Sequence, residues 1–306
     1  MVDSLAASDE NGQAVGADVV AVVLAAGEGR RLRPLTGLRP KPLCPVGDRP
    51  LIDRALAQVR RATPTVAVNL HHGRDAIEAH LDEQRPTVHR SIEAVEPLGT
   101  AGALGRLRPW IDGRGALVVN ADGWSDADLL ALTHGWDGER VRVLMVPARD
   151  GRPGFGPGVG LVASHLPWAE VARLTPEPAG LYEVMWRRAH DEGRLEAVVH
   201  AGRFVDCGRP ADYLRANRLA IDEAAESLAG AGARSAGSVP ADGYRDGSIV
   251  GDGARVEGRV ERSVIGAGAH VEGVVRDAVV WPGSHVGADE QLVGAVRAGR
   301  LTVEVR

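Results

Sequence analysis

The C-terminal part of the chain repeats with a period of fifteen residues, and few folds accept such a repeat. Three positions recur in register, namely aliphatic residues at 250, 265 and 280, aliphatic residues at 256, 271 and 286, and glycine at 253, 268 and 283. Aliphatic residues spaced by six, with small residues between them, are typical of a parallel β-helix, whose coils stack their aliphatic side chains. About three coils are present in residues 248–306, near the minimum for stability. We therefore expect this module to dock on the main domain or on another copy of the chain, with Trp281 at a docking contact.

A second pattern, in which apolar runs alternate with helical spacing, covers residues 18–225. The run Val19–Ala26 is apolar and rich in β-branched residues, which predicts a strand covered on both faces. Further strands are predicted at 65–70, 116–119, 141–146, 159–163 and 196–200, and helices at 50–62, 74–81, 126–132 and 210–225. Such alternation predicts an α/β domain with a doubly wound sheet and right-handed crossovers. We expect a disordered tail over 1–17 and a linker, partly helical, over 226–247.

Composition excludes several classes of protein. Lys and Arg total 36 against 41 Asp and Glu, so the net charge of −5 provides no general basic field for nucleic acid. Cys44 and Cys207 lie far apart and suggest neither a disulfide framework nor a zinc site. The longest apolar run is far shorter than the ~20 residues of a membrane helix, and no signal peptide is evident. We expect a cytoplasmic protein with no membrane or nucleic-acid partner.

A glycine-containing loop directly follows the first predicted strand. It reads Ala25-Ala26-Gly27-Glu28-Gly29-Arg30-Arg31-Leu32-Arg33-Pro34-Leu35-Thr36. At this edge of a parallel sheet, backbone N–H groups of a loop with glycines can approach phosphate oxygens. The loop matches neither the Rossmann fingerprint, because Leu32 occupies the third glycine position, nor the Walker A motif. Three arginines within four residues favour a triphosphate or pyrophosphate ligand over a solvated basic turn.

Lys41 is the only lysine among 36 basic residues. Pro40 and Pro42 flank it, and they stiffen the backbone and exclude a helix. A compact ammonium can bridge oxygens of two phosphates, whereas a guanidinium has a fixed fork geometry. Its position a dozen residues after the glycine loop lets the chain return to the same site. A chance location is the alternative, and the neighbouring motif argues against it.

The segment Gly27-x-Gly29-x-Arg31-Leu32-x-Pro34-Leu35-Thr36, followed by Pro40-Lys41-Pro42-Leu43, resembles the signature of the sugar-1-phosphate nucleotidylyltransferases, or nucleotide-sugar pyrophosphorylases. Residues 96–104 are similar to the family's base-recognition segment, and residues 118–122 and 204–214 to its two metal-aspartate segments. The closest likeness is to members resembling mannose-1-phosphate guanylyltransferases. The resemblance implies a Rossmann-like mixed sheet with a C-terminal left-handed parallel β-helix, and it covers most of the chain.

The resemblance also implies a role for each matching residue. The residues expected to be catalytic are Arg31 and Lys41; those expected to bind the nucleotide are Leu24, Ala25, Ala26, Gly27, Gly29, Arg30, Gly99 and Thr100; those expected to bind the sugar are Gly160 and Glu183; and those expected to hold Mg²⁺ are Asp122 and Asp206. The expected reaction is in-line attack of a sugar-1-phosphate oxygen on the α-phosphorus of a nucleoside triphosphate, with pyrophosphate leaving. The attacking phosphate is already ionised, so no general base is needed, and catalysis rests on positioning and charge stabilisation.

The residue pattern itself supports the two aspartates. Asp122 follows an apolar strand at the edge where ligands bind, and Asp206 follows Phe204-Val205 in the same manner. Two carboxylates together with phosphate oxygens and water suit octahedral Mg²⁺. The alternative is that each aspartate caps a helix, one starting near Asp126 and the other at Pro210.

The chain departs from the family pattern in its middle segment. Many members carry a Glu-Lys-Pro whose lysine holds the sugar phosphate, and this chain has no second lysine. An arginine (Arg149, Arg187 or Arg188) could substitute, or Lys41 could serve both phosphates. The residues Gly158-Val159-Gly160 stand where Asn-Ala-Gly is common, which removes a side-chain contact to the sugar.

Three readings of the function stay open. GTP with a mannose- or heptose-like phosphate is favoured by residues 98–104, with UTP or dTTP as alternatives. A catalytically silent homologue that binds nucleotide-sugars is disfavoured by the presence of Lys41, Asp122 and Asp206. Acyl transfer by the repeat is disfavoured because the coils are few and His270 and His285 merely share the coil register. A homo-oligomer formed through the β-helix is a further expectation.

Overall fold

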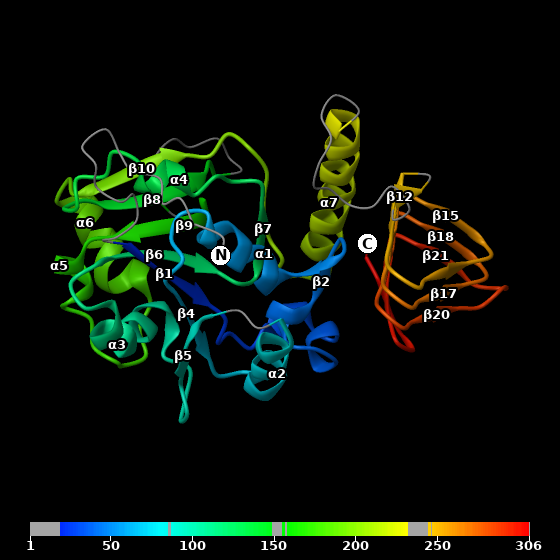
Figure 1. Cartoon of the computed structure of the whole chain (residues 1–306), viewed down its shortest axis with the longest axis horizontal. Coiled ribbons are helices and arrows are strands. Elements are labelled where there is room, and N and C mark those ends of the chain that lie inside the picture. The colour runs from blue at the N-terminus through cyan, green and yellow to red at the C-terminus, as the bar shows by residue number, and fades with distance from the viewer. Residues whose placement is uncertain are drawn as a thin grey trace, which may run out of the picture. The chain divides into compact units, whose positions relative to one another are not determined.

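The chain folds into two compact units (Figure 1). The structure is a computed structural model that describes residues 19–84, 87–148, 155–156, 158–231, 244–245 and 247–305. The first unit contains the chain up to Gly27 together with residues 55–121 and 126–202, and the second contains residues 28–54, 122–125 and 203–306. These units divide the chain differently from the predicted domains, because the second unit takes three segments, 28–54, 122–125 and 203–225, from the predicted domain at 18–225. The predicted tail at 1–17 lies outside the described residues.

A seven-stranded sheet forms the first unit, with the strand order β10-β8-β9-β6-β1-β4-β5. Its strands are β1 (Val19–Leu24), β4 (Val66–Leu70), β5 (His89–Ile92), β6 (Gly115–Asn120), β8 (Val141–Val146), β9 (Gly160–Leu166) and β10 (Leu195–Val199). All neighbours run parallel except β9, which is antiparallel to both β6 and β8. The expected α/β class with a Rossmann-like mixed sheet is therefore confirmed. β5 was not predicted, because its sequence His-Arg-Ser-Ile lacks an apolar run.

Helices pack against this sheet. They are α1 (Leu51–Arg60), whose second half belongs to this unit, α2 (Arg74–Gln84), α3 (Gly99–Ile111), α4 (Leu130–Thr133), α5 (Trp168–Val171), the π-helical turn η4 (Tyr182–Trp186) and α6 (Arg187–Asp191). Val20 and Val22 of β1 share a buried cluster with Leu104 and Leu107 of α3, while the residues of β1 between them face the other way. The alternation of buried side chains therefore places α3 on one face of the sheet.

The prediction of a helix over 126–132 was largely wrong, because the only helix formed there is α4, which begins at Leu130. The Asp128 carboxylate accepts a hydrogen bond from the N–H of Leu130 at 3.2 Å, and Asp126 Oδ1 lies 2.9 Å from His200 Nε2. The Asp128 bond is a local side-chain bond to the backbone, which competes with helix formation, whereas the Asp126 contact joins two side chains far apart in the sequence. Helix formation therefore begins only after these two aspartates.

The second unit contains most of the glycine loop, the segment around Lys41 and the repeat. It contains three short 3₁₀ turns, η1 (Arg30–Leu32), η2 (Leu35–Gly37) and η3 (Lys41–Leu43), the strands β2 (Pro45–Val46), β3 (Arg49–Pro50), β7 (Gly123–Ser125) and β11 (Phe204–Asp206), and the helix α7 (Pro210–Ala231). α7 runs six residues beyond its predicted end at 225 and takes in the start of the predicted linker. Most of the remaining linker lies outside the described residues.

The repeat folds into three stacks of parallel strands, seen in orange to red in Figure 1. The stacks are β13 (Ser248–Val250), β16 (Val264–Ile265), β19 (Val279–Val280) and β22 (Ala295–Ala298); β14 (Arg255–Val256), β17 (His270–Val271) and β20 (His285–Val286); and β15 (Arg259–Glu261), β18 (Val274–Arg276) and β21 (Gln291–Val293). β12 (Tyr244–Arg245) and β23 (Leu301–Glu304) pair antiparallel at the two edges of the first stack. The register pairs Val256 with Val271 and Val271 with Val286, as the fifteen-residue period predicts.

A single buried cluster joins the repeat to the rest of the second unit. It includes Leu32 and Cys44 from the loop segments, Tyr213 from α7, and Val279 and Trp281 from the repeat. The indole N–H of Trp281 donates to the hydroxyl of Tyr213 at 3.0 Å, and that hydroxyl donates to the carbonyl of Pro45. The repeat therefore packs within its own chain through the tryptophan expected to form a docking contact. No helix in the described part of the chain combines the length and the apolar character needed to span a membrane.

The buried His165 gives the first unit a pH-dependent stability. Its Nδ1 lies 3.1 Å from the carbonyl of Leu132, its Nε2 has no partner within the described chain, and burial lowers its pKa from 6.5 to about 4. Between these values the unfolded chain binds a proton at this position and the folded chain does not. We therefore expect stability to fall by about 3 kcal/mol as pH drops from 6.5 to 4, and to be fully present above 6.5.

Urea unfolding between pH 7 and pH 4 measures this effect. His165→Asn keeps a donor for the carbonyl of Leu132 and removes the titration, so its stability should fall less steeply over the same range. Equal slopes for the two proteins would show that His165 does not carry the effect.

Candidate active site

The ammonium of Lys41 lies between two carboxylates in the second unit. Its Nζ is 2.7 Å from Asp122 Oδ2 and 3.3 Å from Asp206 Oδ1. The lysine side chain is only 4% exposed, whereas Asp122 and Asp206 are 40% and 48% exposed. A buried cation thus supports two carboxylates that keep an open side. These three residues were all expected at the site from the sequence, and the structure brings them together.

Short-strand pairing explains why the two aspartates meet. β7 and β11 pair antiparallel, with Asp206 opposite Gly123, the residue after Asp122. The N–H of Cys207 also donates to the carbonyl of Asp122 at 3.2 Å. Antiparallel partners lie about 5 Å apart, so both carboxylates start from the same end of this small sheet. Neither carboxylate hydrogen-bonds the first turn of a helix in the described residues, so the capping alternative does not hold.

Electrostatics keeps Lys41 charged. Burial lowers the pKa of the ammonium, but the charges of Asp122 and Asp206 and the hydrogen bond to Asp122 outweigh burial, so the pKa lies above its ordinary value of 10.5. The guanidinium of Arg31 lies 3.2 Å from Asp206 Oδ2. Two cations therefore balance two carboxylates, and the group as a whole carries no net charge. Burial also raises the pKa of the adjacent Cys207 thiol, which argues against a reactive thiolate there.

The glycine loop is shaped to hold the lysine. Gly29 has a φ of +68°, and a Cβ there would lie 3.0 Å from the Cβ of Lys41 and from Cγ2 of Thr36. The hydroxyl of Thr36 donates to the carbonyl of Gly29 at 3.1 Å. Only glycine fits both this backbone conformation and this close contact. The loop residue Gly29 therefore positions Lys41.

Other arginines of the loop point elsewhere. Arg30 and Arg33 both pair with Glu28, the latter at 2.6 Å, and both are largely exposed. Arg31 alone among these three pairs with a site carboxylate, and the absence of a side chain at Gly208 leaves room for it, because a Cβ there would lie 2.9 Å from Nη2 of Arg31. The structure thus distinguishes Arg31 from its neighbours.

Asp122 and Asp206 fit a magnesium ion. Both offer carboxylate oxygens on the exposed side of the group, and hard oxygen donors are what Mg²⁺ prefers, with water and substrate phosphates completing the shell. Each already shares one oxygen with Lys41, so an ion bound here would stand beside the ammonium. The donor chemistry is that of a site which keeps several positions for phosphate and water.

The predicted phosphate loop of the first unit is held by a buried polar network. The N–H of Ala25 donates to Asn69 Oδ1 at 2.8 Å, and Asn69 Nδ2 donates to Glu93 Oε1 at 2.7 Å. The other oxygen of Glu93 accepts the N–H of Leu98 at 2.8 Å. The loop that contains Leu24, Ala25, Ala26 and Gly27 is therefore tied to the segment that begins at Leu98. A Cβ at Gly27 would meet no atom within 4 Å, so the loop is open on that side.

Sequence reasoning missed Asn69 and Glu93. Asn69 is a polar residue inside the fully buried strand β4, and Glu93, which is 3% exposed, follows β5 directly. A buried polar residue in an otherwise apolar strand must find hydrogen-bond partners, and this was the available signal. Glu93 was missed because the strand that it follows, β5, was not predicted.

Three glycines of α3 lie in close contact with the backbone of residues 175–179. A Cβ would lie 2.5 Å from the carbonyl of Ala179 at Gly99, 2.2 Å from that of Glu177 at Gly102 and 2.2 Å from that of Thr175 at Gly105. These glycines are three residues apart, so they form one stripe along α3. The N–H of Ala101 donates to the carbonyl of Ala179 at 2.9 Å. Backbone contact thus fixes the segment that was expected to recognise the base.

A cavity of about 170 Å³ lies within the first unit, next to β6 and β9. Its wall includes three expected site residues, Leu24, Thr100 and Glu183, together with the unpredicted Asn120 and Trp186. The hydroxyl of Thr100 accepts the N–H of Leu181 at 2.8 Å, which orients it. A neighbouring cavity of about 310 Å³ shares Leu161, Tyr182 and Trp186 with the first and is mostly apolar.

Not every expected residue lines these cavities. Gly160 is on neither wall, although Val159 and Leu161 on either side of it are. Among the substitutes for the missing lysine, Arg188 pairs with the buried Glu170, and Arg149 lies outside the described residues. Arg187 begins α6, next to Trp186.

Comparison with known proteins gives consistent matches. Residues 20–156 match a family model described as nucleotidyl transferase. An N-acetylmuramate alpha-1-phosphate uridylyltransferase from Caulobacter vibrioides is 32% identical over 234 residues, which are 66% of this chain and 97% of that protein. Probable mannose-1-phosphate guanylyltransferase 1 from Oryza sativa subsp. japonica is 28% identical over 277 residues, 77% of this chain and 74% of that protein. The structure of HddC from Yersinia pseudotuberculosis complexed with GMP-PN has a similar fold, with a TM-score of 0.52 at 21% identity over 65% of this chain and 98% of that chain.

The glycine stripe of α3 yields a stability prediction. Alanine normally favours a helix over glycine by about 1 kcal/mol. In Gly102→Ala, however, the methyl group would overlap the carbonyl of Glu177, and we expect a net loss of about 1–3 kcal/mol in the free energy of unfolding. Gly27→Ala, with open space around its new methyl group, is the matched control. Denaturant unfolding measures both, and an unchanged or higher stability for Gly102→Ala would contradict the close packing.

Proposed function

Because this chain belongs to the sugar-1-phosphate nucleotidylyltransferase family, we propose that it transfers a nucleotidyl group from a nucleoside triphosphate to a sugar 1-phosphate and releases pyrophosphate. The observation that supports this most directly is the ammonium of Lys41 between Asp122 and Asp206, with Arg31 beside them. Phosphoryl transfer requires positioned cations and little covalent chemistry from the protein. The group has the charges that such a reaction needs. The reaction needs no general base, because the attacking phosphate is already ionised.

Each residue of the group has a distinct role in this proposal. Lys41 binds the α-phosphate of the nucleotide and the incoming sugar phosphate, and its buried stem restricts where the ammonium can lie. Arg31, which is 63% exposed, holds the leaving pyrophosphate. Asp122 and Asp206 hold Mg²⁺, which when bound neutralises charge on the phosphate oxygens. Fixed cations directed at developing charge stabilise the transition state more than the ground state.

The cavity of the first unit is proposed to bind the uncharged parts of the substrates. Gly99 and Thr100 belong to the helix start that the Asn69–Glu93 network holds in place, and we assign the base to them together with the loop at Leu24, Ala25, Ala26 and Gly27. Glu183 is assigned to the sugar hydroxyls. Tyr182 and Trp186 offer apolar faces of the kind that pack against sugar rings. We also assign to Gly160 a contact with the sugar, which its backbone would make.

We further propose that the stacked coils at the C-terminus are a left-handed parallel β-helix. The support is the parallel pairing of the same positions in successive coils, such as Val250 with Ile265 and Ile265 with Val280. Small side chains and glycines fill the turns, where Gly253, Gly268 and Gly283 all have positive φ. A homo-oligomer formed through this module also stays a proposal.

Substitution of Lys41 tests the reaction and separates it from a catalytically silent homologue. Lys41→Ala removes a transition-state contact of the kind worth about 2.7–4 kcal/mol, so pyrophosphate release should fall about 10²–10³-fold. The matched control is Arg33→Ala, which removes an exposed cation of the same loop that pairs with Glu28 and, among the described residues, with neither site carboxylate. Thermal unfolding of both variants shows whether they fold. A rate for Lys41→Ala within about threefold of the unmodified protein would contradict the proposed role.

GTP is the proposed donor, and UTP is the second candidate. Relatives of both kinds support these choices, since the Caulobacter vibrioides protein is named a uridylyltransferase and the Oryza sativa protein a guanylyltransferase. Pyrophosphate release from GTP, UTP and dTTP, each combined with mannose 1-phosphate, glucose 1-phosphate and N-acetylmuramate 1-phosphate, measures the preference. We expect the highest kcat/KM with GTP. A clear preference for UTP would overturn the assignment of the base and leave the reaction class in place, whereas no release from any pair would favour the silent homologue.

A further inference from the structure

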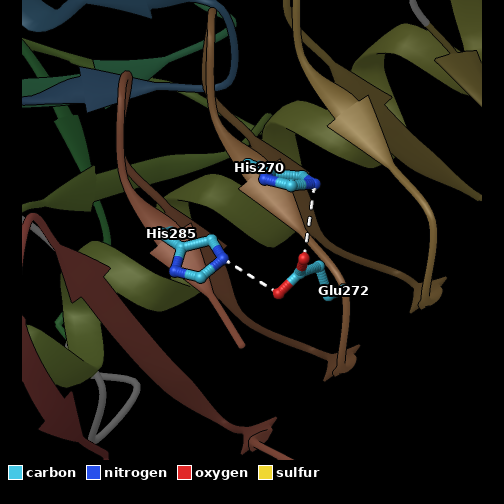
Figure 2. Close-up of side chains that lie close together, drawn as sticks. All are labelled: His270, Glu272 and His285. Carbon is cyan, nitrogen blue, oxygen red and sulfur yellow. Dashed lines mark hydrogen bonds and ion pairs between the residues drawn. The ribbon is translucent and has the colours of Figure 1, made fainter. Parts of the chain in front are cut away.

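Two histidines and a glutamate, none of which has been assigned a role above, meet on the surface of the repeat (Figure 2). His270 and His285 occupy the same position in successive coils and pair in register in β17 and β20. Their rings lie 5.2 Å apart, centre to centre. Glu272, two residues after His270, places its carboxylate beside both rings. Backbone pairing therefore holds the two imidazoles next to each other.

The donor atoms converge on one point. His285 Nε2 is 3.1 Å from one oxygen of Glu272, and His270 Nε2 is 4.0 Å from the other. One donor atom from each of the three residues lies within 4.8 Å of the other two. Ligands at 2.0–2.1 Å from a tetrahedral zinc ion are about 3.3 Å apart, so small side-chain rotations suffice to bind an ion. A second carboxylate, that of Glu257, lies 3.2 Å from His270 Nε2.

We propose that this cluster is a transition-metal site, with Zn²⁺ as its ion. Imidazole nitrogens with a carboxylate suit Zn²⁺ and its neighbours Co²⁺, Ni²⁺ and Cu²⁺, whereas Mg²⁺ and Ca²⁺ prefer oxygen ligands alone. Two histidines and one glutamate make three protein ligands, and Glu257 or water completes the tetrahedron. The side chains are 34–59% exposed, so an ion can enter from solvent without any rearrangement of the coils.

Such a site would link one coil to the next. His270 and Glu272 belong to one coil and His285 to the following coil. The residue stacked on His270 in the preceding coil is Arg255, which cannot bind a metal, so that coil supplies no third imidazole and contributes at most the carboxylate of Glu257. A short stack gains from an added link between coils, because each coil contacts only its neighbours. Zn²⁺ that binds only the folded repeat raises the stability of the protein by mass action.

The repeat itself supplies the decisive variant. His285→Arg places at this position the residue that the chain already accommodates at Arg255, so the coil should fold while one ligand is lost. Glu272→Gln removes the carboxylate with little change in shape. Asp122→Asn is the matched control, because it alters the proposed Mg²⁺ site and leaves the repeat untouched. Excess Mg²⁺ in all samples occupies that second site during the measurement.

The whole 306-residue chain, stripped of metal with a chelator, is titrated with Co²⁺, whose visible absorption reports tetrahedral coordination, and then with Zn²⁺ in competition. We expect one ion per chain for the unmodified protein and for Asp122→Asn, and at least about tenfold weaker binding for His285→Arg and Glu272→Gln. Zn²⁺ should raise the melting temperature of the unmodified protein and not that of His285→Arg, whose pyrophosphate release should be unchanged.

Several results would overturn the proposal. These are no saturable binding, binding that His285→Arg and Glu272→Gln leave unaltered, or binding that Asp122→Asn abolishes. One ion for two chains, accompanied by dimerisation in solution, would replace the link between coils by a link between molecules. None of these results bears on nucleotidyl transfer, which the Lys41 variant tests separately.

Discussion

A buried ammonium between two half-exposed carboxylates is the constraint on which the second unit depends. Removing Lys41 from water is unfavourable for a charged group, and only close anions offset this penalty. β7, β11 and η3 must therefore bring Asp122, Asp206 and Lys41 together for the unit to be stable. In the proposed reaction the same arrangement would favour a polyphosphate substrate, which bare carboxylates would repel. Lys41 and Arg31 balance the two carboxylate charges before a nucleotide binds.

The repeat contributes to the position of the lysine. Trp281 donates to the hydroxyl of Tyr213, which donates in turn to the carbonyl of Pro45, and the guanidinium of Arg39 lies over the indole ring of Trp281 at 5.4 Å. Arg39 and Pro45 bracket Lys41 in the chain, so one coil holds both ends of the segment that carries the ammonium. The interruption of the repeat by a large aromatic residue thus has a physical reason. An aliphatic side chain in place of Trp281 could form neither the hydrogen bond to Tyr213 nor the contact with the guanidinium of Arg39.

The sequence predicted the residues of the charged group better than the way in which they meet. Lys41, Asp122 and Asp206 stood out by composition, by position after apolar runs and by family likeness, and the structure places them within hydrogen-bond distance. Their convergence depends on β7 and β11, strands of three residues that are far apart in the chain. Strands of three residues are too short to show a hydrophobic periodicity, so no sequence pattern could predict them. The fifteen-residue repeat was predictable because the same pattern of aliphatic residues and glycines recurs in successive coils.

The base-recognition segment illustrates a signal that serves two purposes. Gly102 lies within the motif that favoured GTP, and Gly105 lies just after it, yet both are buried against backbone carbonyls of residues 175–177 and have no surface left for a ligand. Their presence therefore reports how α3 packs, which guanylyl- and uridylyltransferases of one fold can share. Selection of the base must then rest on groups that face open space, such as the loop at Gly27 and the cavity wall at Thr100 and Asn120. The family resemblance predicted the reaction class from the charged residues, and it discriminates the base poorly because Gly102 and Gly105 serve the packing of α3.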